Sequence, residues 1–140
     1  MQTDTQIIQI GRALLDGLNA HDLSQWEAML AEDYTGSYPG LRSGADRQIA
    51  KAYNAVFLPA FPDLHFEVER TIANGEVIVY QWMSTGTHSG PLQLPTGTIP
   101  ATGRQGAVPG VLITTVKHGK IVREETYWNQ VELLAQLGIM

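Results

Sequence analysis

The sequence predicts an α+β fold in which three N-terminal helices lie over a curved, mostly antiparallel sheet and a short helix closes the chain. Two observations lead to this prediction. Apolar residues recur at helical spacing through the first 60 residues, and from residue 65 onward they alternate as in strands and are separated by turn sequences. With 140 residues and no internal repeat or linker, the chain is expected to form a single domain over residues 1–140.

Two of the three N-terminal helices have their own start signal. Thr3 and Asp22 are each followed three residues later by a glutamine, which is the spacing of a capping box before a first and a second helix. A third helix is expected over about 45–58 and ends at Pro59. The stretch 36–44, rich in glycine and polar residues, is expected to be a turn between the second and third helices.

The second half of the chain predicts two β-hairpins. The expected strand pairs are 65–73 with 77–85, and 111–117 with 121–128. Asn74-Gly75 and His118-Gly119 supply the two turns. The hairpins are separated by 86–110, a long loop with at most a short strand near 104–108, and loops of this length inside a compact domain are usually functional.

Composition excludes several classes of partner. The net charge of −5 argues against a nucleic-acid ligand, because phosphate binding needs a basic surface. The longest apolar run, 55–62, is too short and too rich in proline to span a bilayer. The N-terminus lacks the basic segment of a secretory signal. A soluble, cytoplasmic protein is therefore expected.

The residues also argue against metal and cofactor chemistry. The four histidines have no metal-ligand spacing, and the chain contains no cysteine. The glycines of the long loop match neither a phosphate-binding loop nor a dinucleotide fingerprint, and there is no Gly-x-Ser-x-Gly motif. We therefore expect a site with no metal and no cofactor, which acts on a small apolar or oxygenated ligand.

Aromatic side chains are the main candidates for ligand binding. Pockets for small apolar molecules are lined by aromatic residues with a few polar groups, and the alternative for each of these rings is a place in the core. The candidate substrate-binding residues are Trp26, Tyr34, Tyr38, Tyr53, Phe57 and Trp82, with His65 and Arg104 as polar members.

The last strand carries the candidate catalytic groups. Period-two alternation puts Glu125, Tyr127 and Asn129 on one face, and Glu124, Thr126 and Trp128 on the other. A Glu-Tyr-Asn set suits either a wet pocket or the outer surface. Asn129 also has the spacing to Glu132 of an N-cap for the closing helix, which ends at Gly138.

His88 is the fourth catalytic candidate. It lies in Gly-Thr-His-Ser-Gly just after a predicted strand, where a histidine can act as a general base or as an orienting donor. The alternative is a loop histidine whose ring is bonded to the backbone.

Six segments in order resemble SnoaL-like polyketide cyclases of the nuclear transport factor 2-like superfamily, and the resemblance covers nearly the whole chain. They are Asn-Ala-His-Asp-Leu at 19–23, Phe-Pro-Asp-Leu at 61–64, Gly-Thr-His-Ser-Gly at 86–90, Pro-Ala-Thr-Gly-Arg at 100–104, Gly-Lys-Ile-Val-Arg-Glu at 119–124 and Leu-Leu-Ala-Gln-Leu-Gly at 133–138.

The resemblance implies a cone-shaped fold with one deep pocket, a homodimer packed through its sheets, and ring closure by aldol condensation without a cofactor. In that chemistry a carboxylate removes a proton from carbon and hydrogen bonds hold the enolate. The chain departs from the family where members commonly have Asp and it has Asn129, and where they commonly have Trp and it has Glu125. Because an amide is a donor and not a base, Glu125 or His88 is the expected base and Tyr127 and Asn129 the expected donors.

Two alternatives to a cyclase or isomerase follow from the same residues. A non-catalytic protein that binds a hydrophobic metabolite would use the same aromatic pocket. An epoxide hydrolase on this fold would need an Asp and an Arg in the pocket, and Arg104 is the arginine that the long loop provides.

Overall fold

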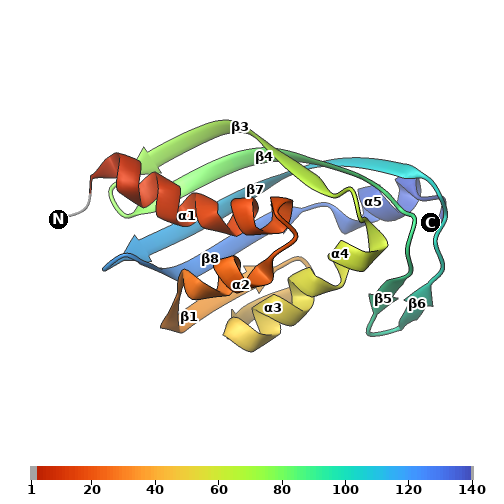
Figure 1. Ribbon diagram of the computed structural model, residues 1–140, viewed down its shortest axis with the longest axis horizontal. Helices are drawn as coiled ribbons and strands as arrows, with labels where there is room; N and C mark the ends of the chain where they lie inside the picture. Colours follow the sequence, from red (N-terminus) through yellow and green to blue (C-terminus); the bar gives the residue numbers. More distant parts are fainter. Residues whose placement is uncertain (1–2, 140) are drawn as a thin grey trace.

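The computed structural model describes residues 3–139, and it confirms the α+β prediction. Helices α1 to α4 lie over one face of a twisted sheet (Figure 1). The helices are α1 Asp4–Asn19, α2 Leu23–Ala28, α3 Arg47–Ala55, α4 Phe57–Ala60 and α5 Gln130–Gln136. The strands are β1 Leu30–Tyr38, β2 Leu41–Ala45, β3 His65–Asn74, β4 Val77–Thr87, β5 Leu92–Leu94, β6 Gly97–Ile99, β7 Gln105–Lys117 and β8 Lys120–Trp128.

Six of the strands form one mixed sheet in the order β2-β1-β8-β7-β4-β3. All neighbours are antiparallel except β1 and β8, which pair in parallel. Strands β5 and β6 pair only with each other and form a separate hairpin that projects beyond one end of the sheet (Figure 1). None of the helices within residues 3–139 is long and apolar enough to cross a membrane.

Several local predictions are confirmed. Thr3 makes both bonds of the capping box. Asp22 caps α2 by accepting a bond from the Ser24 backbone N–H, so the cap is confirmed but not the capping box predicted with Gln25. The β7–β8 turn is at His118-Gly119, where both residues have positive φ, of 52° and 76°, as a type I′ turn requires. The β3–β4 turn lies one residue later than predicted, because Asn74 still pairs with Val77.

The prediction of a polar turn at 36–44 is wrong, because most of this stretch is in strands. β1 begins at Leu30, directly after α2, and β2 returns antiparallel to it. Glycines and a proline mask the strand signal here, and on its other side β1 pairs with β8, about 90 residues further along the chain. The third helix is also divided, into α3 and α4.

The long loop contains more strand than predicted. β7 is continuous from Gln105 to Lys117, so the short strand expected near 104–108 is the start of a longer one. The rest of the loop carries the β5–β6 hairpin. Leu92 of this hairpin is buried with Phe61 and Leu137 in a second apolar cluster, apart from the main core.

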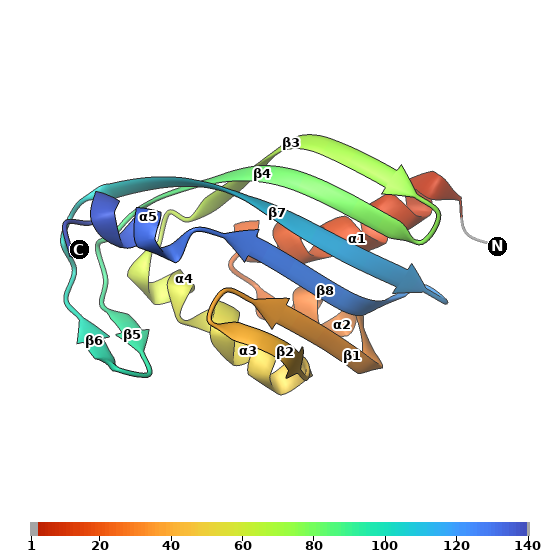
Figure 2. The ribbon, with the colours of Figure 1, turned by 180° about the vertical axis from the view of Figure 1, so that it is seen from behind.

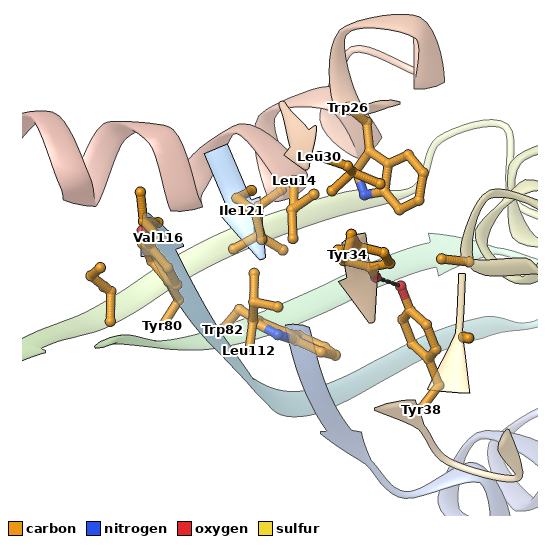
Figure 3. Packing of buried hydrophobic residues seen from close by; sticks show 14 residues of the cluster. Leu14, Trp26, Leu30, Tyr34, Tyr38, Tyr80, Trp82, Leu112, Val116 and Ile121 are labelled. Atoms are coloured by element: carbon orange, nitrogen blue, oxygen red, sulfur yellow. Dashed lines mark hydrogen bonds between the residues drawn. The ribbon is translucent and has the colours of Figure 1, made fainter. Parts of the chain in front are cut away.

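The main core lies between α1, α2, α3 and the concave face of the sheet (Figure 3). Its fully buried large side chains include Trp26, Tyr80, Leu14, Ile78, Leu112 and Ile121. α1 packs closely on β4 and β7 because Gly11 has no side chain. A Cβ at Gly11 would lie on the Thr114 hydroxyl and 2.5 Å from the Tyr80 hydroxyl.

Replacement of Gly11 by alanine tests this close contact. Alanine is the better helix former by about 1 kcal/mol, but forcing atoms into a packed core costs about 1–3 kcal/mol. Because the Tyr80 hydroxyl is held by the carbonyl of Ile8, we expect Gly11→Ala to lower the free energy of unfolding by about 1 kcal/mol in chemical denaturation. Gln9→Ala, on the exposed side of the same helix, should be neutral, and equal effects at both positions would contradict the packing argument.

Candidate active site

A partly open cavity lies between the helices and the concave face of the sheet, beside the main core. Its volume is about 90 Å³. One water molecule needs roughly 10–15 Å³ on the same measure, so the cavity has room for several. The lining is mainly apolar and aromatic. It consists of Leu14, Leu15, Leu18, Tyr38, Tyr53, Asn54, Phe57, Phe61, Leu64, Phe66, Trp82, Ser84, Thr85, Gly86, Gly106, Val108, Leu112, Glu124, Thr126, Trp128 and Leu133.

Four aromatic rings form a continuous wall from β1 to β8. Tyr38 stacks on Tyr53 with ring centroids 4.4 Å apart, and Tyr53 meets the edge of Phe57 at 5.7 Å. Phe57 in turn meets Trp128 edge-on at 5.8 Å. Because α3 and α4 carry the two middle rings, the helical layer and the sheet are joined through this wall.

Glu124 of β8 is the one acidic or basic side chain in the cavity lining, among the side chains that the structure describes. It is only 4% exposed. Its Oε1 accepts bonds from the hydroxyls of Tyr34, at 2.6 Å, and Tyr38, at 2.7 Å. Its Oε2 accepts a bond from the Thr126 hydroxyl at 2.8 Å. Three hydroxyl donors therefore surround a buried carboxyl group.

Burial shifts the ionisation of this cluster. Loss of water raises the pKa of Glu124, and the hydroxyl bonds from Tyr34, Tyr38 and Thr126 act in the opposite direction. Burial and the nearby carboxyl raise the pKa of both tyrosines, so their hydroxyls stay protonated and remain donors. The hydroxyls of Tyr34 and Tyr38 also lie 3.0 Å apart (Figure 3).

Comparison with known proteins identifies the fold and the family. The model of the SnoaL-like polyketide cyclase family matches residues 8–137. The chain belongs to this family. Among curated proteins, none matches the sequence.

Solved structures with the same fold cover nearly the whole chain. A proposed SnoaL-like polyketide cyclase from Jannaschia sp. CCS1 is 21% identical, with a TM-score of 0.84 over 100% of this chain and 98% of that one. IdmH from Streptomyces antibioticus, a proposed polyketide cyclase, is 24% identical, with a TM-score of 0.77 over 95% and 99%. A protein of ketosteroid isomerase-like fold from Catenulispora acidiphila, in complex with trimethylamine, is 16% identical, with a TM-score of 0.74 over 99% and 96%.

At these identities the solved structures establish the nuclear transport factor 2-like fold of this family member and no particular reaction. The predicted family and fold are thus confirmed.

The structure brings four of the predicted ligand-binding residues to the cavity of this SnoaL-like protein. Tyr38, Tyr53, Phe57 and Trp82 all line it. The sequence did not single out Asn54, Phe61, Phe66, Ser84 or Glu124, which line it as well.

The other four predicted ligand-binding residues lie outside the cavity lining. Trp26 is fully buried in the main core, and Tyr34 is buried behind Glu124. His65 is exposed at the start of β3, with its Nε2 3.7 Å from a carboxyl oxygen of Glu67. Arg104 is exposed, and its guanidinium packs against Gly138.

The structure corrects the placement of Glu125, Tyr127 and Asn129, because the opposite face of β8 points into the cavity. Tyr127 is 55% exposed on the outer face, beside Glu125. Asn129 is exposed and caps α5 by accepting a bond from the Glu132 backbone N–H, as its spacing predicted.

A β-bulge sets which face of β8 points inward. Ile121 pairs with Val116, whereas Arg123 pairs with Thr115, so Val122 is an extra residue in the strand. Ile121 is fully buried, and strict alternation from it would turn 123, 125 and 127 inward. The extra residue reverses this parity and turns Glu124 into the cavity.

His88 lies at the base of the β5–β6 hairpin and not in the cavity lining. Its ring is fully buried and stacks on Phe61, with centroids 5.3 Å apart. Its Nδ1 accepts a bond from the Thr102 backbone N–H at 3.3 Å and lies 3.0 Å from the Thr102 hydroxyl. Burial lowers the pKa of His88. In this position His88 holds the two arms of the hairpin together.

Replacement of Glu124 by glutamine should change how stability depends on pH. Because the folded-state pKa of Glu124 is raised above its ordinary value of 4.5, the stabilising effect of its proton is complete below that value and is lost as the pH rises through the folded pKa. Glutamine has no proton to lose. We therefore expect the free energy of unfolding of Glu124→Gln to increase relative to the wild type between pH 4 and pH 8, as measured by denaturant titration.

Glu125→Gln, on the outer face of the same strand, is the matched control and should show no such trend. If the Glu124→Gln and wild-type curves ran parallel over this pH range, the buried carboxyl would not be linked to stability in the way described.

Proposed function

We propose that this protein is a small-molecule enzyme in which Glu124 transfers a proton during aldol cyclisation or isomerisation of a mostly apolar, oxygenated substrate. The observation that carries the proposal is a single buried carboxyl group, held by three hydroxyls, in the wall of an aromatic cavity. Membership of the SnoaL-like polyketide cyclase family supports the same reaction class.

Burial suits Glu124 to the role of a base. A carboxylate with a raised pKa accepts a proton from carbon more readily than a solvated one, and it still ionises near neutral pH if donors hold its charged form. Glu124 has both features, since it is 4% exposed and accepts three hydroxyl bonds. In the reaction, its carboxylate takes the proton from the carbon beside a substrate carbonyl and an enolate forms.

Tyr53 is the proposed donor to the enolate oxygen. It lines the cavity, and within residues 3–139 its hydroxyl donates a long bond, of 3.4 Å, to the carbonyl of Pro39, with the side chains of Trp128 and Gln130 also close to it. Burial raises the pKa of Tyr53 to about 12, so the hydroxyl keeps its proton at neutral pH. In a cyclisation, the enolate carbon then bonds to a second carbonyl of the same molecule, and the resulting alkoxide takes its proton back from Glu124. No atom or electron is left over.

A non-catalytic binding protein is the second candidate, because the apolar walls alone would hold a hydrophobic metabolite. An epoxide hydrolase is less well supported. Neither an aspartate nor an arginine lines the cavity, among the side chains that the structure describes.

Exchange of carbon-bound hydrogen tests the proposed proton transfer without knowledge of the natural substrate. Aromatic 1,3-dicarbonyl compounds would be incubated with the protein in D₂O, and loss of the proton signal at the acidic carbon followed by NMR. We expect the wild type to accelerate exchange for the compounds that bind. Glu124→Gln should reduce this acceleration by roughly 10²–10⁴-fold with little loss of affinity, as for removal of a general base.

Glu125→Gln is the matched control for this experiment and should retain full exchange. A wild-type protein that binds the compounds and leaves their exchange rate unchanged would identify a binding protein instead. Unchanged exchange in Glu124→Gln would assign the proton transfer to another group.

We also propose that the protein is a homodimer that packs through the outer face of its sheet. Figure 2 shows this face of β3, β4, β7 and β8 without a covering helix. Ile72, Val79 and Ile113 are direct neighbours across three strands, and Tyr127 pairs with Val111 in an adjacent row. Ile72 is 50% and Tyr127 55% exposed, so the patch is open to a partner.

The charges at the patch favour a second copy of the chain. Arg123 and Glu125 form an ion pair of 3.3 Å at its edge, and Arg70 and Glu67 lie on the outer side of β3. A surface that carries both signs of charge around an apolar centre can match itself across a two-fold axis.

Substitution at the centre of the patch tests the dimer. We expect the wild type to have the mass of a dimer in size-exclusion chromatography with light scattering, and Ile113→Glu to have the mass of a monomer. Ile49→Glu, which places the same charge at a 45% exposed position on α3, should remain dimeric. A monomeric wild type, or a dimeric Ile113→Glu, would disprove the proposed interface.

A further inference from the structure

Tyr34 contacts Glu124 from outside the cavity. It is 2% exposed, and its hydroxyl donates a bond of 2.6 Å to Oε1 of Glu124. Tyr38 donates to the same oxygen but lines the cavity, whereas Tyr34 is not part of the lining. Tyr34 can therefore act on a ligand only through its neighbours.

A glycine provides the space for this contact. Gly36 is the partner of Glu124 in the parallel β1–β8 pair and lies between Tyr34 and Tyr38 on the same face of β1. A Cβ at Gly36 would overlap the Tyr34 hydroxyl and lie 3.3 Å from a ring carbon of Tyr38. Both hydroxyls reach Glu124 because this position has no side chain.

The two oxygens of Glu124 differ in the number of bonds they accept. A carboxylate oxygen accepts about two hydrogen bonds. Oε1 accepts one from Tyr34 and one from Tyr38, so its capacity is filled. Oε2 accepts one from Thr126 and has room for one more. A proton from the ligand can thus be taken up at Oε2 without breaking an existing bond.

We infer that Tyr34 is a positioning residue, which holds Oε1 of Glu124 from behind the cavity wall so that Oε2 exchanges protons with the ligand. The inference rests on the proposed role of Glu124. Tyr34 is then not the ligand-binding residue that the sequence predicted, but a residue that orients the carboxyl group of the proposed base, Glu124. Its hydroxyl also favours the charged carboxylate, and without it Glu124 would ionise only at higher pH.

Phenylalanine at position 34 tests the inference, because it removes the hydroxyl and keeps the ring. We expect the acid limb of the exchange rate against pH to move up by about one unit in Tyr34→Phe, which is the usual effect of one lost hydrogen bond. The exchange rate should recover at high pH, and KM should change little because Tyr34 does not line the cavity. Tyr38→Phe should move the limb and also change KM.

Tyr80→Phe is the matched control, since Tyr80 is a fully buried tyrosine whose hydroxyl donates to the carbonyl of Ile8. It should leave the acid limb in place. Incorporation of 3-fluorotyrosine at position 34 keeps the hydroxyl and makes it a stronger donor. It should move the limb to lower pH, which a loss of folding would not do.

Titration of Glu124 by carbon-13 NMR separates this inference from the proposed function. The Glu124 carboxyl carbon should titrate at higher pH in Tyr34→Phe than in the wild type, whether or not the protein catalyses exchange. If the wild type showed no exchange and Glu124 still shifted, the proposed reaction would fail and the contact between Tyr34 and Glu124 would stand. An unmoved titration in both Tyr34→Phe and the fluorotyrosine protein would overturn the inference.

Discussion

The candidate site is built around one carboxyl group that is kept out of water, which costs free energy unless donors compensate it. Glu124 is enclosed by β1, β8 and the aromatic wall, and its desolvation is offset by hydroxyl groups from Tyr34, Tyr38 and Thr126. Neutral donors stabilise a carboxylate less completely than a salt bridge would, so the group stays able to change its protonation state. The same burial that makes the site costly for folding raises the pKa of Glu124, the feature on which the proposed reaction rests.

The parallel pairing of β1 with β8 is what allows this cluster to form. In this register Gly36 pairs with Glu124, and the tyrosines two residues before and after the glycine converge on one carboxyl group. The bulge at Val122 then turns Glu124 inward. The site therefore depends on two features of neighbouring strands. Gly36 in β1 has no side chain, and Val122 in β8 is an extra residue.

Much of the fold could be predicted from the sequence, because its signals are local. Capping residues at Thr3 and the turn at His118-Gly119 fix element ends from a few neighbouring residues. The strand β1 could not be recognised in this way, since one of its two neighbouring strands, β8, lies about 90 residues away. The inward face of β8 was predicted wrongly because alternation separates the two faces of a strand without showing which of them faces the cavity. A single bulge reverses the alternation, and no local residue pattern around Val122 announces it.

The β5–β6 hairpin has a consequence for how this scaffold can diversify. The hairpin is fastened at its base by His88 and Thr102 and packs, through Leu92, on an apolar cluster that includes Phe57, Phe61, Leu64 and Leu133. These four side chains also line the cavity. Changes in the length or sequence of the hairpin can therefore reshape this part of the cavity lining, while the Glu124 cluster on β1 and β8 stays untouched.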